Sequence, residues 1–378
     1  MIINNVKLVL ENDVVHGSLE VHDGEIRAFA ETQSRLPEAF DGEGGWLLPG
    51  LIELHTDNLD KFFTPRPKVD WPAHSAMSSH DALMVASGIT TVLDAVAIGD
   101  VRDGGDRLEN LEKMINAVEE TQKRGLNRAE HRLHLRCELP HHTTLPLFEK
   151  LVGREPVSLV SLMDHSPGQR QFANREKYRE YYQGKYSLTD VQMRQYEEEQ
   201  LALAARWSQP NRTAIAGMCR ERHIALASHD DATHEHVVES HQLGSVIAEF
   251  PTTFEAAESS RRHGLNVLMG APNIVRGGSH SGNVAAHKLA ALGLLDILSS
   301  DYYPASLLDA AFRVAEDDNN AFTLPQAIHL VTRNPARSLN LHDRGVIAEG
   351  KRADLVLAHR KGEHIHIDHV WRQGKRVF

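Results

Sequence analysis

Residues 47–61, LLPGLIELHTDNLDK, decide how the chain is expected to fold. An apolar run follows a Pro-Gly turn and stops at His55 and Asp57, which lie two residues apart. Residues i and i+2 of a β-strand project to the same face. We therefore expect both side chains to point to one place at the end of a buried strand, where they can share a metal ion.

Seven further apolar runs follow, with helix-like segments between them. The eight runs cover residues 50–57, 88–96, 131–139, 157–165, 223–231, 244–252, 265–273 and 294–304. Alternating strands and helices are typical of a parallel sheet, and eight such units predict an α/β fold with a (β/α)8 barrel. The catalytic residues of such barrels lie at the C-terminal ends of the strands.

Both ends of the chain are rich in short strands and in glycine. We predict that residues 1–49 and 340–378 form one small β-sandwich domain and that residues 50–339 form the barrel. A polar insert at about 166–210 interrupts the barrel pattern and holds five of the seven tyrosines. It is either a lid or an oligomer contact, or a solvated helical pair.

The composition excludes several classes of protein. A net charge of -11 argues against nucleic-acid binding. No apolar run approaches the roughly 18 residues of a membrane span, and the N-terminus does not resemble a signal peptide, so we expect a cytoplasmic protein. The only cysteines are Cys137 and Cys219, which rules out a disulfide framework or a cysteine-based zinc site. The sequence gives no indication of the oligomeric state.

Polar residues close several of the apolar runs at the predicted catalytic end. The candidate metal ligands are His55, Asp57, Glu138, His165, His229 and Asp301. So many histidines and carboxylates would repel one another unless divalent cations lay among them. We expect two ions, with zinc as the first choice and manganese or iron as alternatives, and Glu138 as a bridging ligand.

Two of the strand ends carry acidic residues of particular interest. At the fifth, Asp231 follows His229 at the same spacing that separates His55 from Asp57. At the eighth, we expect Asp301 to be both a ligand and the acceptor of a proton from water. The alternative for Asp301 is an ordinary helix cap in the sequence SSDYYP.

The loop after the seventh run, residues 271–289, predicts an anion site. Glycines, hydroxyl groups and an asparagine precede a predicted helix, an arrangement that presents N–H groups to an anion. The candidate substrate-binding residues are Arg276, Ser279, His280, Ser281 and Asn283 in this loop, with Lys61 and Arg66 after the first strand. A flexible turn and solvated surface charges are the alternatives.

These features resemble the amidohydrolase superfamily of metal-dependent hydrolases. The resemblance rests on the split β-sandwich, the entry strand LLPGLIELHTD, the late aspartate and the closing GVIAEGKRADLVL at residues 345–357, and it covers nearly the whole chain. Three stretches, at residues 53–67, 249–257 and 270–283, are similar to one branch of the superfamily, which acts in bacterial phosphonate catabolism through the carbon-phosphorus lyase pathway. That resemblance implies hydrolysis of a 5-triphosphate on a ribose that carries a methylphosphonate, with release of diphosphate and Asp301 as the base.

The chain also departs from the common pattern of the superfamily. Most members have a second histidine where this chain has Asp57, and the sixth run ends in AEFPT without a histidine. Either Glu249 replaces that ligand or His165 supplies it from the fourth strand, and we favour His165. Two other functions stay open: hydrolysis or deamination of a cyclic amide or aminopurine, and a metal-free scaffold.

Overall fold

The structure is a computed structural model, and it describes residues 1–99, 106–279 and 281–378. The chain forms two compact units. Unit 1 contains Met1–Asp94, Ala117–Arg132 and Met269–Phe378, and unit 2 contains Ala95–Asn116 and Leu133–Leu268.

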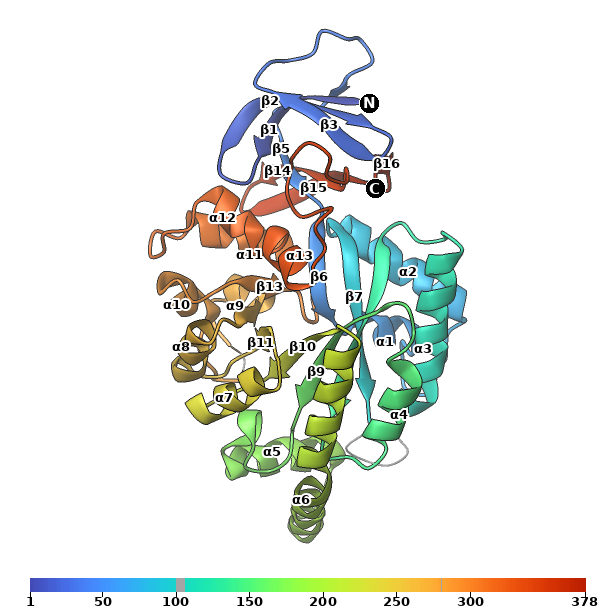
Figure 1. Cartoon of the computed structure of the whole chain (residues 1–378), viewed down its shortest axis with the longest axis vertical. Coiled ribbons are helices and arrows are strands. Elements are labelled where there is room, and N and C mark those ends of the chain that lie inside the picture. The colour runs from blue at the N-terminus through green and yellow to red at the C-terminus, as the bar shows by residue number, and fades with distance from the viewer. Residues whose placement is uncertain (100–105, 280) are drawn as a thin grey trace. The chain divides into compact units, whose positions relative to one another are not determined.

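Strands from both ends of the chain form one sheet in unit 1, and both termini lie in it (Figure 1). Its order is β16-β15-β14-β5-β1-β2-β3, with β4 beside β1. The strands are β1 (Ile2–Val9), β2 (Val14–His22), β3 (Glu25–Ala30), β4 (Phe40–Asp41), β5 (Trp46–Pro49), β14 (Leu355–Lys361), β15 (His364–Arg372) and β16 (Lys375–Arg376). The antiparallel pairing of β5 with β14 joins the two ends.

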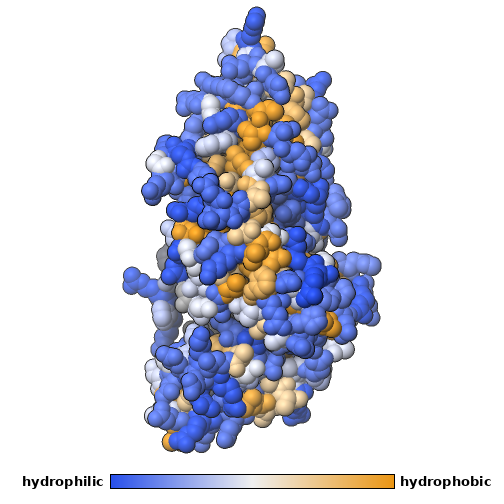
Figure 2. Space-filling view, turned by 90° about the vertical axis from the view of Figure 1, so that its left-hand side faces the viewer, coloured by the Kyte–Doolittle hydropathy of each residue, from blue (hydrophilic) through white to orange (hydrophobic). Residues whose placement is uncertain are grey.

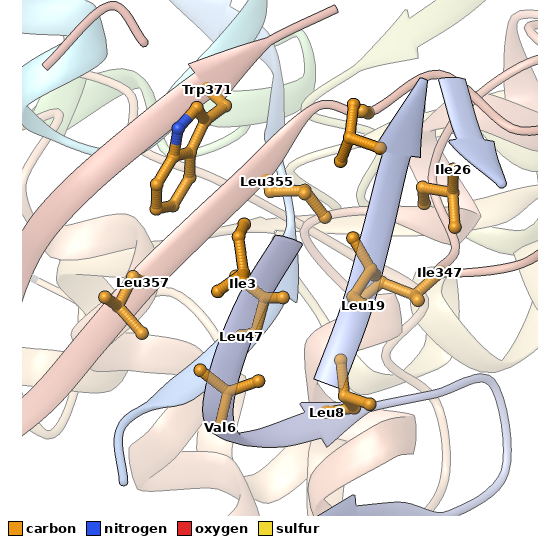
Figure 3. Packing of buried hydrophobic residues seen from close by; sticks show 12 residues of the cluster. Ile3, Val6, Leu8, Leu19, Ile26, Leu47, Ile347, Leu355, Leu357 and Trp371 are labelled. Atoms are coloured by element: carbon orange, nitrogen blue, oxygen red, sulfur yellow. The ribbon is translucent and has the colours of Figure 1, made fainter. Parts of the chain in front are cut away.

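A hydrophobic core holds this sheet together (Figure 3). Ile3 and Leu47 from the first part of the chain pack in one cluster with Leu355 and Trp371 from the last part, and all four are buried. Burying such side chains contributes about 1.5 to 3 kcal/mol each. The predicted sheet built from both termini is therefore confirmed.

The eight apolar runs form eight strands of a second, parallel sheet. They are β6 (Leu51–Thr56), β7 (Ile89–Ile98), β8 (Glu130–Glu138), β9 (Val157–Met163), β10 (Ala225–His229), β11 (Ile247–Glu249), β12 (Asn266–Gly270) and β13 (Ile297–Ser299). Their order follows the chain from β6 to β13. Thr56 of β6 also pairs with Asp301, two residues beyond β13, so the sheet is a nearly closed barrel. The predicted fold class is confirmed.

Helices alternate with these strands along the chain. They are α1 (Asn58–Phe63), α2 (Ala73–Ala86), α3 (Asp106–Lys123), α4 (Thr144–Leu151), α5 (Arg175–Tyr186), α6 (Asp190–Glu221), α7 (His234–Gln242), α8 (Phe254–Arg262), α9 (Ala271–Arg276), α10 (Ala286–Ala291), α11 (Ser306–Glu316), α12 (Leu324–His329) and α13 (Arg333–Ser338). Threonine hydroxyls accept N–H bonds at the start of α6, α7, α8 and α12, which is a favoured cap because these N–H groups lack a partner in the helix.

No helix in the described part of the chain has both the length and the apolar character needed to cross a membrane. On the face shown in Figure 2, hydrophobic residues lie in small groups between larger hydrophilic areas.

The polar insert consists of a short 3-10 turn, Arg170–Phe172, followed by α5 and the first part of α6. These two helices lie side by side (Figure 1). Their aromatic residues form a buried cluster of their own: Phe172, Tyr178, Tyr182, Met193 and Tyr196. The insert is thus helical, but it is packed around a small core instead of being solvated on all sides.

A buried network of charges ties α2 to β7 and to the start of β8 within unit 1. Asp94 accepts hydrogen bonds from His80 at 2.6 Å and from His131 at 2.8 Å, and the other nitrogen of His131 lies 2.9 Å from Asp81. Burial lowers the pKa of His131, but the carboxylates of Asp94 and Asp81 raise it by more, to about 9. His131 is therefore a buried cation between two carboxylates.

Candidate metal-binding site

One group of possible metal ligands lies in unit 1. Nε2 of His55 is 3.6 Å from Oδ2 of Asp57 and 3.9 Å from Oδ1 of Asp301. His55 is buried because every residue of β6 is buried, whereas about a third of each aspartate side chain is exposed. The sequence predicted that these three residues come together, and the structure places them together.

Local backbone conformation directs the two aspartates of this group. Asp57 precedes the first residue of α1, but its carboxylate does not cap that helix. Asp301 has a φ of 55°, a left-handed conformation that aspartate tolerates better than most residues. It is not a helix cap either, because α11 begins five residues later, after Ala305.

Glu53 supports this group and was not among the residues predicted from the sequence. One of its oxygens accepts the N–H of His55 at 2.8 Å, and the other accepts the N–H of Ser300 at 2.7 Å. Burial raises the pKa of Glu53 to about 7, although these hydrogen bonds lower it. Glu53 thus links the backbone beside His55 to the backbone beside Asp301. Its spacing of two from His55, in an otherwise apolar strand, was the available signal.

A second group lies in unit 2. Oδ2 of Asp230 is 3.3 Å from Nε2 of His229 and 3.7 Å from Nε2 of His165. The two imidazole rings meet edge to face, with their centroids 5.6 Å apart. All three residues can offer an atom to one metal ion.

Two glutamates orient the histidines of this second group. Glu138 lies 2.7 Å from Nδ1 of His165, and Glu249 lies 2.9 Å from Nδ1 of His229. Histidines that bind metals usually donate their other ring nitrogen to such a partner. Glu138 thus contacts the ring nitrogen of His165 that does not face Asp230. The other oxygen of Glu138, Oε2, is buried and has no hydrogen-bond partner in the described chain.

The distances between side-chain atoms distinguish hydrogen bonds from pairs of atoms that could bind the same metal ion. Zinc bonds of about 2.0–2.1 Å in a tetrahedron separate neighbouring ligand atoms by about 3.3 to 3.4 Å. The separations to the aspartates are 3.3, 3.6, 3.7 and 3.9 Å, which lie at or somewhat above that value, whereas the two Nδ1 contacts are short enough to be hydrogen bonds. Both donor sets therefore fit a divalent cation.

The electrostatics of the second group agree with this interpretation. Burial lowers the pKa of His165, but the carboxylates of Glu138 and Asp230 raise it by more, to about 10. The same carboxylates that raise this pKa also attract a metal cation.

The fifth strand differs from expectation in one residue. Simple alternation paired Asp231 with His229, but it is Asp230 that lies beside His229. Asp230 has a φ of 56°, which interrupts the strand alternation. The carboxylate of Asp231 instead lies 3.0 Å from Nε of Arg170 and accepts the hydroxyl of Ser240 at 2.7 Å. Asp230 was not predicted from the sequence, because strand alternation assumes an extended backbone.

The candidate anion-binding residues in unit 1 are only partly brought together. Ser279, Ser281 and Asn283 hydrogen-bond to one another. Arg276 is exposed at the end of α9, and Lys61 and Arg66 are exposed on and after α1. His280 lies outside the described residues.

Sequence comparison identifies a highly similar relative. The chain is 90% identical, over all 378 residues and the full length of both chains, to alpha-D-ribose 1-methylphosphonate 5-triphosphate diphosphatase of Escherichia coli strain K12. The chain belongs to this family of diphosphatases. The broader amidohydrolase family also matches, over residues 222–378.

Solved structures confirm the fold of this diphosphatase family member. N-acetylglucosamine-6-phosphate deacetylase of Thermotoga maritima has a TM-score of 0.60 at 14% identity, and the match covers 100% of this chain and 99% of that one. The 5-methylcytosine deaminase of Klebsiella pneumoniae has a TM-score of 0.64 at 16% identity, with 100% and 98% covered. At these identities, the likeness establishes the fold alone.

Proposed function

We propose that the chain hydrolyses alpha-D-ribose 1-methylphosphonate 5-triphosphate to the 5-phosphate and diphosphate. The observation that carries this proposal is the 90% identity over the full length of the named diphosphatase. The chain is thus a hydrolase of phosphorus anhydrides that takes a small phosphorylated sugar as substrate and serves phosphonate catabolism. Its cytoplasmic location remains a prediction.

We propose that each ligand group holds one divalent cation, zinc in the first place and manganese or iron otherwise. His55, Asp57 and Asp301 would hold one ion, and His165 with His229 and Asp230 would hold another. A bound cation of this kind supplies Lewis acidity, which lowers the pKa of water and offsets the negative charge of phosphoryl oxygens. Glu138 and Glu249 hold the two histidines of the second group in the orientation that leaves Nε2 for the ion.

Asp301 is the residue that we propose as proton acceptor. Its carboxylate is partly exposed and lies at the end of β13, next to the buried ring of His55. Glu53 accepts the backbone N–H of His55 and that of Ser300, the residue before Asp301. These bonds hold the carboxylate of Asp301 where it can take a proton from water. Cleavage of an anhydride needs no strong general acid, since diphosphate is a good leaving group.

We assign substrate binding to the cationic and polar residues predicted from the sequence. They are Lys61, Arg66, Arg276, Ser279, His280, Ser281 and Asn283. Arginine and lysine offset the charge of the triphosphate and of the leaving diphosphate. The hydroxyl groups of Ser279 and Ser281, which lie 3.1 Å apart, offer hydrogen bonds to the same anion.

The alternative of a cyclic-amide hydrolase or a deaminase has weaker support. It rests on a likeness to solved structures at 14% and 16% identity, which carries no information on the substrate. A metal-free scaffold is also disfavoured, because both ligand groups are present.

Phosphorus NMR tests the proposal directly. Metal-analysed protein is incubated with the ribosyl methylphosphonate triphosphate, and with adenosine triphosphate in parallel. We expect diphosphate and a 5-monophosphate to appear together, and a chelator to abolish the reaction. An intact substrate in the presence of bound metal would refute the proposed reaction and leave a panel of cyclic amides and aminopurines to be tested.

A further inference from the structure

The left-handed backbone at Asp230 requires a structural cause. A φ of 56° lies in the left-handed region, which aspartate tolerates better than most residues but which is still less favourable than right-handed backbone, so the surroundings help to hold it. This conformation brings the carboxylate of Asp230 beside His229. The residues that hold it therefore affect the second ligand group without belonging to it.

Backbone hydrogen bonds hold the segment on one side. The N–H of Asp230 donates to the carbonyl of Glu249 at 2.9 Å, and the N–H of Thr252 donates to the carbonyl of Asp231 at 3.0 Å. These contacts attach the residues after β10 to the last residue of β11 and to the loop that follows it. They fix the position of the main chain at Asp230 and Asp231.

Side-chain contacts hold the same segment on the other side, through the tyrosine-rich insert. Asp231 is 1% exposed, and its two oxygens are held by Arg170 at 3.0 Å and by Ser240 at 2.7 Å. Arg170 is itself 4% exposed and reaches Glu239 of α7 at 3.3 Å. Removing either partner of such a buried ion pair is strongly destabilising, because it leaves an uncompensated charge.

The same turn of the insert also contacts a histidine of the group. Phe172, two residues after Arg170, meets the ring of His165 edge to face with a centroid separation of 6.2 Å. It packs as well against Tyr178 and Tyr182 of the insert core. The short turn Arg170–Phe172 thus makes two contacts at this site. Phe172 packs against His165, and Arg170 forms an ion pair with Asp231, the residue after Asp230.

We propose that Arg170 is a positioning residue for the cation that the second group binds. It acts through Asp231, which holds Asp230 in the left-handed conformation that completes the ligand set with His165 and His229. The inference rests on the proposed function, because it requires that this group bind a metal ion. It gives the insert a role in building the metal-binding site.

Zinc affinity in a single-site background tests the inference. Replacing the partly exposed Asp57 and Asp301 by alanine disables the first group, so that the remaining zinc reports on the second. Metal-free protein is titrated with Zn²⁺ against a competing chelator, and Co²⁺ is added separately to record its absorption spectrum. Arg170→Met is compared with Arg179→Met, whose guanidinium pairs with Glu197 within the same insert.

We expect Arg170→Met to weaken zinc binding about tenfold or more and to change the Co²⁺ spectrum, as loss of an outer partner of a metal site does. Arg179→Met is expected to match the background. If both variants bind like the background, the positioning role is wrong while the metal group stands. If the background itself binds no Zn²⁺, the metal group is wrong and the inference fails with it.

Ser240→Ala covers the case in which Arg170→Met does not fold, as judged by thermal unfolding. It removes only the hydroxyl that donates to Asp231. We expect it to weaken zinc binding by a smaller factor than Arg170→Met. Unchanged affinity in a folded Ser240→Ala variant, with Arg170→Met unfolded, would overturn the inference.

Discussion

Nδ1 of His229 lies 2.9 Å from Oε1 of Glu249, a carboxylate that is almost completely buried at the end of β11. This contact leaves the other ring nitrogen, Nε2, on the side of Asp230. Glu249 is also a candidate metal ligand from the sequence, and this hydrogen bond suits a carboxylate that orients His229.

Replacement of Glu249 by glutamine should therefore lower zinc affinity without abolishing it. The amide keeps the size of the side chain and can still accept a hydrogen bond, but it loses the charge that strengthens His229 as a ligand. We expect a loss of about 10- to 100-fold, measured by chelator competition. Glu235→Gln, at an exposed site on α7, is the matched control. Equal affinity in the two variants would contradict the orienting role.

Replacement of Asp301 by asparagine should separate catalysis from folding. Loss of a general base lowers turnover by about 10²- to 10⁴-fold, while the amide oxygen keeps the shape of the site. The measurement is turnover by phosphorus NMR together with metal content by mass spectrometry. Asp318→Asn, at an exposed position after α11, should behave like the unmodified protein. Near-normal turnover of Asp301→Asn would exclude it as the base.

Replacement of Glu53 by glutamine should disturb the first group through the backbone. The carboxylate accepts one N–H with each oxygen, whereas an amide can accept only with one and turns a donor towards the other N–H. An unsatisfied buried donor destabilises by about 1 to 3 kcal/mol. Urea unfolding measures this loss, and turnover is expected to fall as well. A variant with unchanged stability and turnover would mean that these two hydrogen bonds do not hold the group.

The buried network at His131 predicts a pH dependence of stability. The folded pKa of about 9 lies above the ordinary 6.5, so the stabilisation is complete below about pH 6.5 and is lost as the pH rises through 9. The pKa values of Asp81 and Asp94 are lowered, so their contribution persists above pH 4 and disappears only in acid. We expect the free energy of unfolding to fall between pH 6.5 and 9.

His131→Gln provides the comparison for this pH dependence. It should be less stable at neutral pH, by about 3 to 5 kcal/mol, because two carboxylates lose their buried cation. Its stability should also vary less between pH 6.5 and 9. The control is His22→Gln, at an exposed residue paired with Asp23. If His131→Gln keeps the pH dependence of the unmodified chain, another group is responsible for it.

The sequence by itself determined the fold and brought together the three residues of one candidate ligand group. Eight apolar runs and two strand-rich ends are local patterns, and runs such as β6 and β7 read as continuous apolar segments because nearly all of their side chains are buried. His55 and Asp57 could be paired because they lie two residues apart, and Asp301 because it closes the last run. Short-range periodicity was sufficient for these predictions.

Only the tertiary structure decided which side chains complete and support the groups. Asp230 replaced Asp231 beside His229 because a left-handed residue reverses the side-chain direction, which no alternation rule anticipates. Glu138 and Glu249 became partners of His165 and His229 through contacts 27 and 20 residues apart in the chain. Arg170 reaches Asp231 across 61 residues. Such pairings depend on how distant segments pack together, and local sequence patterns do not predict this packing.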